Sequence, residues 1–469
     1  MTQKHKDADI KTRMSDEELL KLESKYCSWG DTVHYVEHPN IFERCKGSCL
    51  YDRDGVEFLD LQMWYSAGNF GYNNERINNV LKKQIDRLPQ LACQYLHEEK
   101  IRLAAKLAQR VETTFEEKGR IHFNVGGSQA VEDSLKLVRK HTGRSLMFAF
   151  MGGYHGRTLG ASAITSSFRY REHYGHFGER ANFIPFPYCF RCFYGKKRDT
   201  CNMYCLKQFE KLFETEYYGV VDRKTNVCEF AAFYVEAVQG TGGYQVAPRE
   251  YLSGLKKILD KYNVLMVDDE IQMGFFRTGK FLSIEHFDVT PDIIVFGKAL
   301  TNGMNPIAGI WAKEMLISPK VFGPGSTHST FSSNPQGTAM GLEVMKIIEE
   351  SDFATEVPRK GKYFVSRLKA LQKKYPQIGD VDGLGLALRM EMCEKDGYTP
   401  NKKLTDAIEE IGLTGKLTAG GKHRGLVLDV GGYYKNVFTM APSLYITEKE
   451  IDLGVDLFEE ALKLALKRS

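Results

Sequence analysis

Short runs of apolar residues, many of them β-branched, recur through the middle of the chain. Residues 264–267 read Val-Leu-Met-Val and residues 293–296 read Ile-Ile-Val-Phe, with comparable runs at 145–150 and 230–235. Such runs are too short for independent helices, and apolar residues at successive positions indicate strands that are covered on both faces. The pattern therefore predicts a buried, mostly parallel sheet.

Segments with helical spacing alternate with these runs and give an α/β fold class. They span 77–88, 99–111, a segment starting near 128, a segment starting near 337, and 451–466, the last preceded by the capping box Thr447 to Glu450. Asp54-Gly55 between alternating apolar residues predicts a two-residue hairpin within 50–58. Strands at 386–392 and 425–429 begin a smaller domain. We expect residues 71–335 to form the large domain, and segments 1–70 and 336–469 to form a smaller α+β domain.

Composition adds little to this picture. The 469 residues are 42% hydrophobic and 26% charged, with a net charge of +4, so no nucleic-acid partner is indicated. The first eighteen residues are polar and charged, and no run approaches the length of a membrane span. These features predict a cytoplasmic protein with no membrane association.

Charged residues follow two of the predicted strands. Asp268, Asp269 and Glu270 close the first strand, and Lys298 comes one residue after the second. Because the carboxyl ends of parallel strands meet at a ligand-binding edge, an acid and an amine are expected in one crevice. Pyridoxal phosphate (PLP) chemistry needs such a pair, with an amine that forms a Schiff base and a carboxylate that keeps the pyridine ring protonated. A structural ion pair is the alternative.

Residues 274–280, GFFRTGK, match the glycine and lysine spacing of a nucleotide-binding P-loop. Phe281 stands where that motif requires a Ser or Thr for magnesium, and two Phe residues inside the loop would obstruct the phosphate cradle. A nucleotide hydrolase is therefore disfavoured.

Two further strand ends carry candidate ligand-binding groups. Gly127 and Ser128 precede a predicted helix whose free N–H groups can bind an anion, although a plain strand-to-helix connection has the same appearance. Tyr154 can cover a pyridine ring, and Arg157 can bind a carboxylate or act as a surface salt-bridge partner. Trp64 and Tyr65, among small residues, suit either a site or simple packing.

DDEIQMGFFRTGKF followed by PDIIVFGKAL resembles the core of the class III, ornithine and 4-aminobutyrate type aminotransferases, and the resemblance extends from about Phe42 to the C-terminal helix. It implies a fold type I enzyme that binds PLP. Lys298 matches the Schiff-base lysine and Asp269 the carboxylate at the ring nitrogen. The other implied cofactor contacts are Gly127, Ser128, Tyr154, Glu236, Gln272 and Thr330, and the implied substrate contacts are Trp64, Tyr65 and Arg157.

The resemblance also implies an assembly and an activity. Thr330, in the hydroxyl-rich loop 320–335, matches a residue that reaches the cofactor phosphate of the neighbouring subunit, which implies a homodimer or a dimer of dimers. The expected activity is amino transfer from an amine or amino acid to a 2-oxo acid. A racemase, aminomutase or decarboxylase on the same fold is the alternative, and a non-catalytic metal-binding or interaction protein is a further one.

The chain departs from its relatives at a pair of charges. Many class III enzymes bind the α-carboxylate of glutamate with an Arg that a Glu neutralises when the other substrate is bound. Thr439 stands at the Arg and Thr241 at the Glu. We therefore expect glutamate and 2-oxoglutarate to be poor partners, and any carboxylate to be held by Arg157, Lys435 or Arg424.

Four cysteines lie in an insertion at about 187–228. Cys189, Cys192, Cys201 and Cys205 give the spacing C-x2-C-x8-C-x3-C, which can hold zinc or an iron–sulfur cluster. Free cysteines are also common as small buried side chains. Both interpretations stay open on the sequence.

Overall fold

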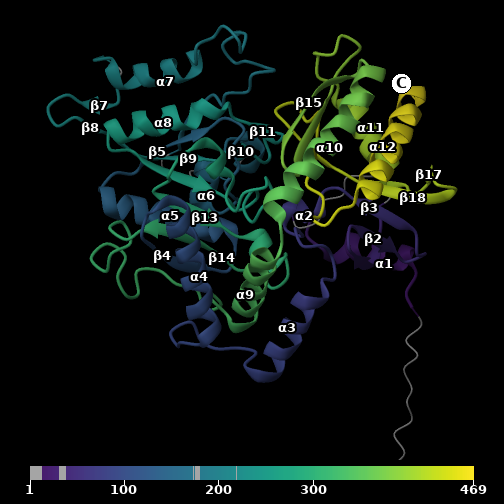
Figure 1. Ribbon diagram of the computed structural model, residues 1–469, viewed down its shortest axis with the longest axis horizontal. Coiled ribbons are helices and arrows are strands. Elements are labelled where there is room, and N and C mark those ends of the chain that lie inside the picture. The colour runs from purple at the N-terminus through teal and green to yellow at the C-terminus, as the bar shows by residue number, and fades with distance from the viewer. Residues whose placement is uncertain (1–12, 31–38, 173, 175–179, 218, 469) are drawn as a thin grey trace, which may run out of the picture.

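A seven-stranded sheet occupies the centre of the larger part of the molecule (Figure 1). The structure is a computed structural model and describes residues 13–30, 39–172, 174, 180–217 and 219–468. The strands, in spatial order, are β4 (Gly119–Asn124), β14 (Ala308–Lys313), β13 (Ile293–Phe296), β12 (Leu265–Asp269), β9 (Phe230–Val235), β5 (Leu146–Phe150) and β6 (Asn182–Ile184). β14 is antiparallel to both of its neighbours, and the other pairs are parallel. The predicted parallel sheet is confirmed, although β14 was not foreseen.

Alternate residues of the central strands point to opposite faces and both faces are buried. Met266 and Ile294 belong to one apolar cluster, whereas Val267 and Ile293 belong to another on the opposite face. Because Asp269 pairs with Val295 in register, β12 and β13 end at the same edge. This register brings the charged residues that follow the two strands together.

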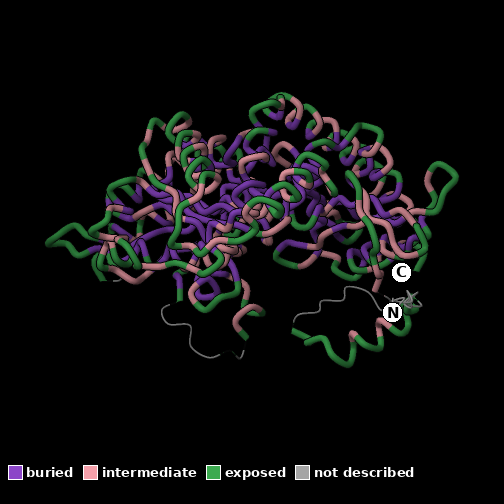
Figure 2. The backbone as a smooth tube through the Cα atoms, turned by 90° about the horizontal axis from the view of Figure 1, so that it is seen from below, coloured by how far each residue is buried: buried purple, intermediate pink, exposed green. Residues whose placement is uncertain are grey.

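Helices cover both faces of this sheet. α5 (Gly127–Thr142) packs against β13, β14 and β4, while α8 (Arg249–Lys261) packs against β12 and α7 (Tyr204–Glu214) packs against α8. Among the other helices of this part, α4 (Glu98–Phe115) contacts β4 and α6 (Leu159–Ile164) contacts β5. α9 (Pro335–Glu350) packs against α4 and α3 (Glu75–Arg87). Figure 2 shows the buried backbone concentrated in the interior, with exposed segments around it.

Segments from the two ends of the chain share one sheet. Its order is β1 (Phe42–Lys46), β2 (Cys49–Asp52), β3 (Glu57–Asp60), β18 (Lys422–Val427) and β17 (Leu417–Ala419), and β3 runs parallel to β18. The two lie side by side at the right of Figure 1. The hairpin at Asp54-Gly55 is present, but its strands are separated by residues 53–56 rather than by the two residues predicted.

A second C-terminal sheet has the order β15 (Ile378–Leu384), β16 (Ala387–Met392), β20 (Val437–Met440) and β19 (Asp429–Gly431). Its helices are α10 (Phe353–Lys374), α11 (Lys402–Leu413) and α12 (Glu448–Arg468). The Thr447 and Glu450 side chains form the predicted capping box with each other's backbone.

The remaining elements are short or peripheral. They are α1 (Asp16–Tyr26), α2 (Met63–Ser66), η1 (Phe168–Tyr170), β7 (Val221–Asp222), β8 (Val227–Cys228), β10 (Val238–Gln239), β11 (Gln245–Val246), η2 (Ser283–Phe287) and η3 (Lys298–Thr301). Within the described part of the chain, no helix combines the length and the apolar character needed to cross a bilayer.

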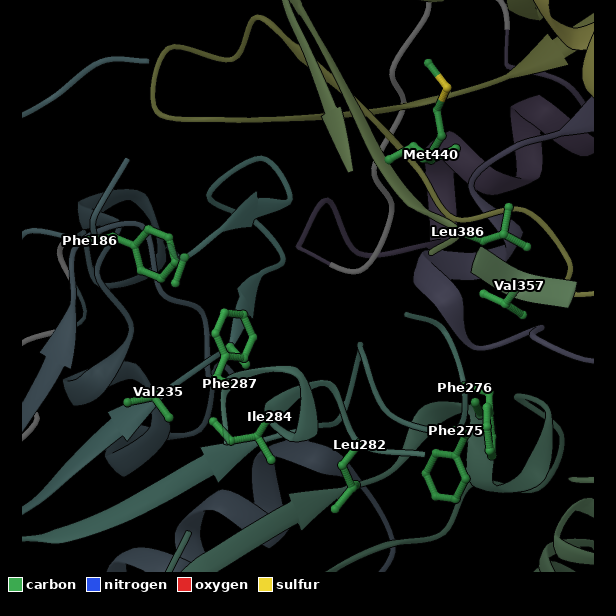
Figure 3. Close-up of a cluster of buried hydrophobic side chains, with 14 of the residues drawn as sticks. Phe186, Val235, Phe275, Phe276, Leu282, Ile284, Phe287, Val357, Leu386 and Met440 are labelled. Carbon is green, nitrogen blue, oxygen red and sulfur yellow. The ribbon is translucent and has the colours of Figure 1, made fainter. Parts of the chain in front are cut away.

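The loop that follows β12 is packed into the core rather than open to a phosphate. Phe275 and Phe276 are buried in a cluster that also holds Val357, Leu386 and Met440 (Figure 3). The P-loop alternative for residues 274–280 is therefore wrong, because its backbone groups face protein.

Arg277 of this loop is fully buried and joins three distant segments. Its Nε donates to Ser66 Oγ at 2.8 Å and its Nη2 donates to Asn69 Oδ1, while its Nη1 donates to the carbonyl oxygens of Leu386 at 3.1 Å and Pro442 at 2.6 Å. Burial lowers its pKa to about 10, so the side chain stays protonated at neutral pH.

Replacing Arg277 by Met should destabilise the fold by about 3 to 5 kcal/mol, because four acceptors lose their buried donor. Urea unfolding followed by circular dichroism measures this change. The matched control is Arg249→Met, since the Arg249 side chain is 76% exposed and pairs with exposed Asp288; it should cost less than about 1 kcal/mol. Equal effects of the two substitutions would contradict the assigned role of Arg277.

Candidate active site

A cavity of about 320 Å³ opens at the carboxyl ends of β12 and β13. It is lined by Trp64, Tyr65, Ala67, Gly126, Gly127, Ser128, Tyr154, His155, Gly156, Glu236, Asp269, Ile271, Gln272, Lys298, Gly303, Pro306, Ile307 and Ala308. Of the candidate binding residues identified in the sequence, Arg157, Arg424, Lys435, Thr330 and the four cysteines are not part of this lining. The acid and the amine predicted to share a crevice do share it.

Lys298 lies at the start of η3, directly after Gly297 at the end of β13. Its φ of +40° places it in the left-handed region, which only a well-packed backbone holds for a non-glycine residue. Burial lowers the pKa of Lys298 to about 8, against the opposing effect of Asp269, Glu236 and Asp429. The neutral amine is therefore a minority form near physiological pH, but a much larger one than for an ordinary lysine, and it can act as a nucleophile or base.

Asp269 is held by a histidine that our sequence analysis did not identify. Its Oδ2 lies 2.8 Å from Nδ1 of His155, and both side chains are almost fully buried. Burial by itself lowers the pKa of His155, but Asp269 outweighs it and the net shift is upward. The only indication of His155 in the sequence was its position next to Tyr154, after a predicted strand.

The two acidic neighbours of Asp269 are buried in the protein core and do not line the cavity. Asp268 is fully buried, and its pKa is raised well above the usual range by burial and by Glu270. Glu270 Oε1 accepts hydrogen bonds from Ser283 Oγ and Ile284 N, both at 2.8 Å. Only Asp269 of the three lines the cavity.

Glu236 supports the turn that carries Tyr154. Its Oε1 accepts from the Tyr154 N–H at 2.9 Å and its Oε2 from the Gly240 N–H at 2.8 Å. Burial raises the pKa of Glu236 to about 7, with His155 opposing the shift. Glu236, His155 and Asp269 thus form one buried cluster below the cavity.

The N-terminus of α5 provides a place for an anion. Gly126 precedes the helix, and a Cβ at Gly126 would meet no atom within 4 Å, so its backbone borders open space. At Gly156 a Cβ would lie 2.4 Å from Ser128 Oγ, and its φ of +129° also requires glycine. Free helix N–H groups beside this open space suit a phosphate.

Aromatic side chains border the cavity. Trp64 and Tyr65 project from a turn in which residues 63–66 all have positive φ, between 44° and 67°. The Tyr154 ring makes an edge contact with Tyr170 at 5.1 Å. Gln272, an expected cofactor contact, donates from Nε2 to the Tyr244 hydroxyl at 2.9 Å.

Several predicted residues lie outside the cavity. Arg157 is exposed, with its guanidinium 4.7 Å from the Tyr170 ring centroid. Arg424 pairs with Glu57 at 2.8 Å in the sheet shared by the two chain ends, so it does not line the cavity. Thr330 is exposed, and Lys435 Nζ donates to the Val430 carbonyl at 3.3 Å.

Comparison with known proteins identifies the family. The family described as "Aminotransferase class-III" matches residues 32–462. The chain belongs to the class III aminotransferase family.

Individual relatives are similar along almost their whole length. The chain is 31% identical to a leucine/methionine racemase of Thermococcus litoralis, over 96% of both chains, and 30% identical to an acetylornithine aminotransferase of Caldanaerobacter subterraneus, over 95% of this chain and 99% of the relative. An amine transaminase structure from an uncultivated Pseudomonas species, solved in its PLP-bound form, matches with a TM-score of 0.81 at 23% identity, covering 92% of this chain and 96% of that one. The last likeness shows the fold.

The cavity of this class III family member fits PLP. It combines a neutralisable amine at Lys298, a carboxylate at Asp269 and open helix N–H groups at Gly127. Tyr154 is also part of the lining and offers an aromatic side chain to a pyridine ring. The amine, the carboxylate and the helix N–H groups therefore match the aldehyde, the pyridine nitrogen and the phosphate of PLP.

The four cysteines of the insertion line a separate cavity of only about 20 Å³. Burial raises the pKa of the Cys189 thiol to about 11 and also raises that of Cys205, so these thiols are neutral. Among the residues that the structure describes, no group of three or more His, Cys, Asp or Glu side chains is arranged to hold a metal ion. The expectation of zinc or an iron–sulfur cluster is therefore not supported.

In the Asp269→Asn variant we expect the pKa of His155 to fall below the ordinary histidine value of about 6.5, because burial then acts without the carboxylate. The measurement is an NMR titration of the imidazole ring protons in protein freed of PLP, with a His155→Gln variant for assignment. His286, whose pKa burial lowers to about 4, is the internal control and should not change. An unchanged titration of His155 would refute the pairing.

Proposed function

We propose that the chain uses PLP attached at Lys298 to move an amino group from an amine or amino acid to a 2-oxo acid. PLP supplies an electrophilic aldehyde and an electron-withdrawing ring, which is the chemistry that amino transfer requires. The observation that carries the proposal is the amine of Lys298, with a pKa of about 8, in one cavity with the buried Asp269.

Lys298 has two tasks in this scheme. Its neutral form would hold PLP covalently, and the same amine, when free, would serve as the base and acid that moves the proton of the substrate. A pKa near the working pH suits a group that must both accept and release a proton.

Asp269 and His155 maintain the charge that the ring needs. Asp269 is proposed to face the ring nitrogen and keep it protonated, while the His155 imidazole fixes the position of the carboxylate at 2.8 Å. Glu236 fixes the Tyr154 turn through two backbone hydrogen bonds. These residues act by position and electrostatics.

The proposed acceptor is not 2-oxoglutarate. The glutamate-binding Arg and its neutralising Glu of many relatives are replaced by Thr439 and Thr241, and the Thr439 hydroxyl donates to Asp429 at 2.6 Å. A second carboxylate would meet an acid there instead of a guanidinium. A smaller acceptor such as pyruvate suits this arrangement better, with Arg157, whose side chain hydrogen-bonds Tyr154 of the lining, as a candidate for the remaining carboxylate.

A racemase is the second candidate. The similarity to the leucine/methionine racemase of Thermococcus litoralis favours it. Both reactions begin with proton removal by Lys298 and differ in whether the proton returns to the same carbon and whether an oxo acid is consumed.

Lys298→Ala should lower turnover by at least about a thousandfold without unfolding the protein, because the nucleophile and the proton carrier are lost together. The assay mixes single enantiomers of amino acids with pyruvate and measures both the new amino acid and the enantiomer of the donor. Lys320→Ala, which removes an exposed lysine, is the control. If the donor amino acid were converted to its other enantiomer in the absence of an oxo acid, the activity would be that of a racemase and not of an aminotransferase.

Thr330 is proposed to act in the neighbouring subunit of a homodimer, because it is exposed and absent from its own subunit's cavity. Mixing inactive Lys298→Ala protein with a Thr330→Ala variant of weakened PLP affinity should then restore one intact site per hybrid dimer. Cofactor titration of the refolded mixture measures this recovery. If Thr330 acted within its own subunit, no hybrid site would be intact and wild-type affinity would not return.

A further inference from the structure

A second cavity, of about 460 Å³, lies where the start of the insertion meets the C-terminal domain. Its wall combines residues from the segment 185–193, residues 398–400 between β16 and α11, Tyr433 and Tyr434 between β19 and β20, and Met151 after β5. In the described part of the chain, this cavity and the active-site cavity have no lining residue in common. Its volume is within the range of about 300 to 1,000 Å³ that is typical of small-molecule sites.

Aromatic side chains make up half of this wall. Of the twelve residues that line the cavity, six are aromatic, and Phe186 and Tyr188 among them are buried. The four exposed rings are those of Phe193, Tyr398, Tyr433 and Tyr434. Contiguous exposed aromatic surface on a soluble protein often marks a binding site. The wall therefore suits a flat ligand that stacks against rings.

Arg191 is the one charged residue among the described residues of this wall, and its side chain is only 8% exposed. Its Nε donates to Glu391 Oε1 at 2.5 Å, and its Nη2 donates to the Tyr398 carbonyl oxygen and to Cys393 Sγ. No residue that the structure describes accepts a hydrogen bond from Nη1, and this nitrogen is not enclosed by protein. A nine-tenths buried guanidinium thus keeps one nitrogen, with two N–H donors, for a ligand.

One buried carboxylate beside the cavity is shared by two guanidinium groups. Glu391 Oε1 accepts from Arg191, while its Oε2 accepts from Arg389 Nη2 at 2.7 Å. The Tyr188 hydroxyl also donates to Oε2. The other acid of this cluster, Asp380, pairs with Arg389 and is not part of the cavity wall. Because Glu391 divides its charge between two arginines, the charge of Arg191 is only partly compensated, and the cavity favours an anion.

The groups that would meet such a ligand are already held in place by the protein. The Tyr433 hydroxyl donates to the Met151 carbonyl oxygen at 2.8 Å. The Arg191 guanidinium lies 4.6 Å from the centroid of the Tyr398 ring and 5.5 Å from that of the Tyr434 ring. Because these side chains are fixed before a ligand enters, binding loses less conformational entropy.

We propose that this second cavity binds a small molecule that combines a flat aromatic ring with one anionic group. The ring stacks against the aromatic wall, and the anionic oxygens accept hydrogen bonds from Nη1 of Arg191, since a guanidinium suits both carboxylates and phosphates. The site is separate from the active-site cavity, and the proposal does not depend on amino transfer.

Calorimetry on the PLP-loaded protein tests the proposal with an aromatic carboxylate and an aromatic phosphate. Indole-3-acetate is compared with indole-3-acetamide, which lacks the charge, and with acetate, which lacks the ring. Phenyl phosphate is compared in the same way with phenol and inorganic phosphate. We expect at least one aromatic anion to bind with a Kd below about 1 mM, and its two partial analogues to bind at least about tenfold more weakly. The probe that binds decides between the carboxylate and the phosphate. Failure of both probes to bind, or equal binding of a probe and its analogues, would overturn the proposal.

Variants of the exposed rings locate the bound probe without threatening the fold. Tyr434→Ala and Phe193→Ala each remove an exposed ring of the wall and should weaken binding about two- to tenfold, because stacking is lost. The matched control is Tyr217→Ala, which removes a fully exposed tyrosine outside the cavity and should leave binding unchanged. If Tyr434→Ala altered the oligomeric state in light scattering and left probe binding unchanged, the exposed rings would form a protein interface and the proposal would be wrong.

Arg191→Lys tests the anionic half of the ligand. The variant keeps a positive charge beside Glu391 but loses the planar guanidinium, so it should weaken binding of the anionic probe about tenfold and leave its neutral analogue unaffected. Arg157→Ala separates the two cavities, because it changes a residue next to the active site and should not alter probe binding. Loss of binding in Arg157→Ala alone, with wild-type affinity in Arg191→Lys, would place the probe at the active site and refute the second site.

Discussion

The buried guanidinium of Arg277 fixes the arrangement on which the active site depends. Its donors bind Ser66 and Asn69 near the N-terminus and the carbonyls of Leu386 and Pro442 near the C-terminus. A charged group without a carboxylate partner is costly to bury, and its donors must therefore all be used. The hydrogen bonds of Arg277 to Ser66 and Asn69 therefore stabilise the left-handed turn at residues 63–66. This turn places Trp64 and Tyr65 at the cavity.

The parallel register of β12 and β13 brings Asp269 and Lys298 to the same edge of the sheet. Strand alternation sends Asp268 into the core and Asp269 into the cavity, so adjacent carboxyl groups acquire different environments. Burial then lowers the pKa of Lys298, while Asp269, Glu236 and Asp429 limit the fall. The pKa of Lys298 is therefore set by its buried position at the end of β13 and by the acidic residues near it.

The parts of this site that local sequence could predict are those set by strand ends and glycines. Lys298, Asp269, Tyr154 and the Gly127 turn were found because apolar runs stop beside them. His155 was missed because one histidine carries no spacing signal, and its role depends on Asp269 more than a hundred residues away. The positive φ values of residues 63–66 depend on Arg277 in the same way. β14 was overlooked although its apolar run was visible in the sequence. The pairing of β3 with β18 could not be predicted from local sequence, because it joins opposite ends of the chain. The cysteine spacing left a metal site open, because spacing alone does not determine whether thiols converge with ligand geometry.

The substitutions at Thr241, Thr439 and the presence of Asp429 form one electrostatic argument. An Arg at position 439 would face Asp429 across paired strands and would be neutralised by it, which would abolish binding of a substrate carboxylate. A Glu at position 241 would then have no cation to balance and would add repulsion to the same region. An Arg alone would thus be paired but unable to bind a substrate carboxylate, and a Glu alone would be unpaired, so neither charge is useful without the other. The Thr439 hydroxyl instead donates a hydrogen bond to Asp429 at 2.6 Å.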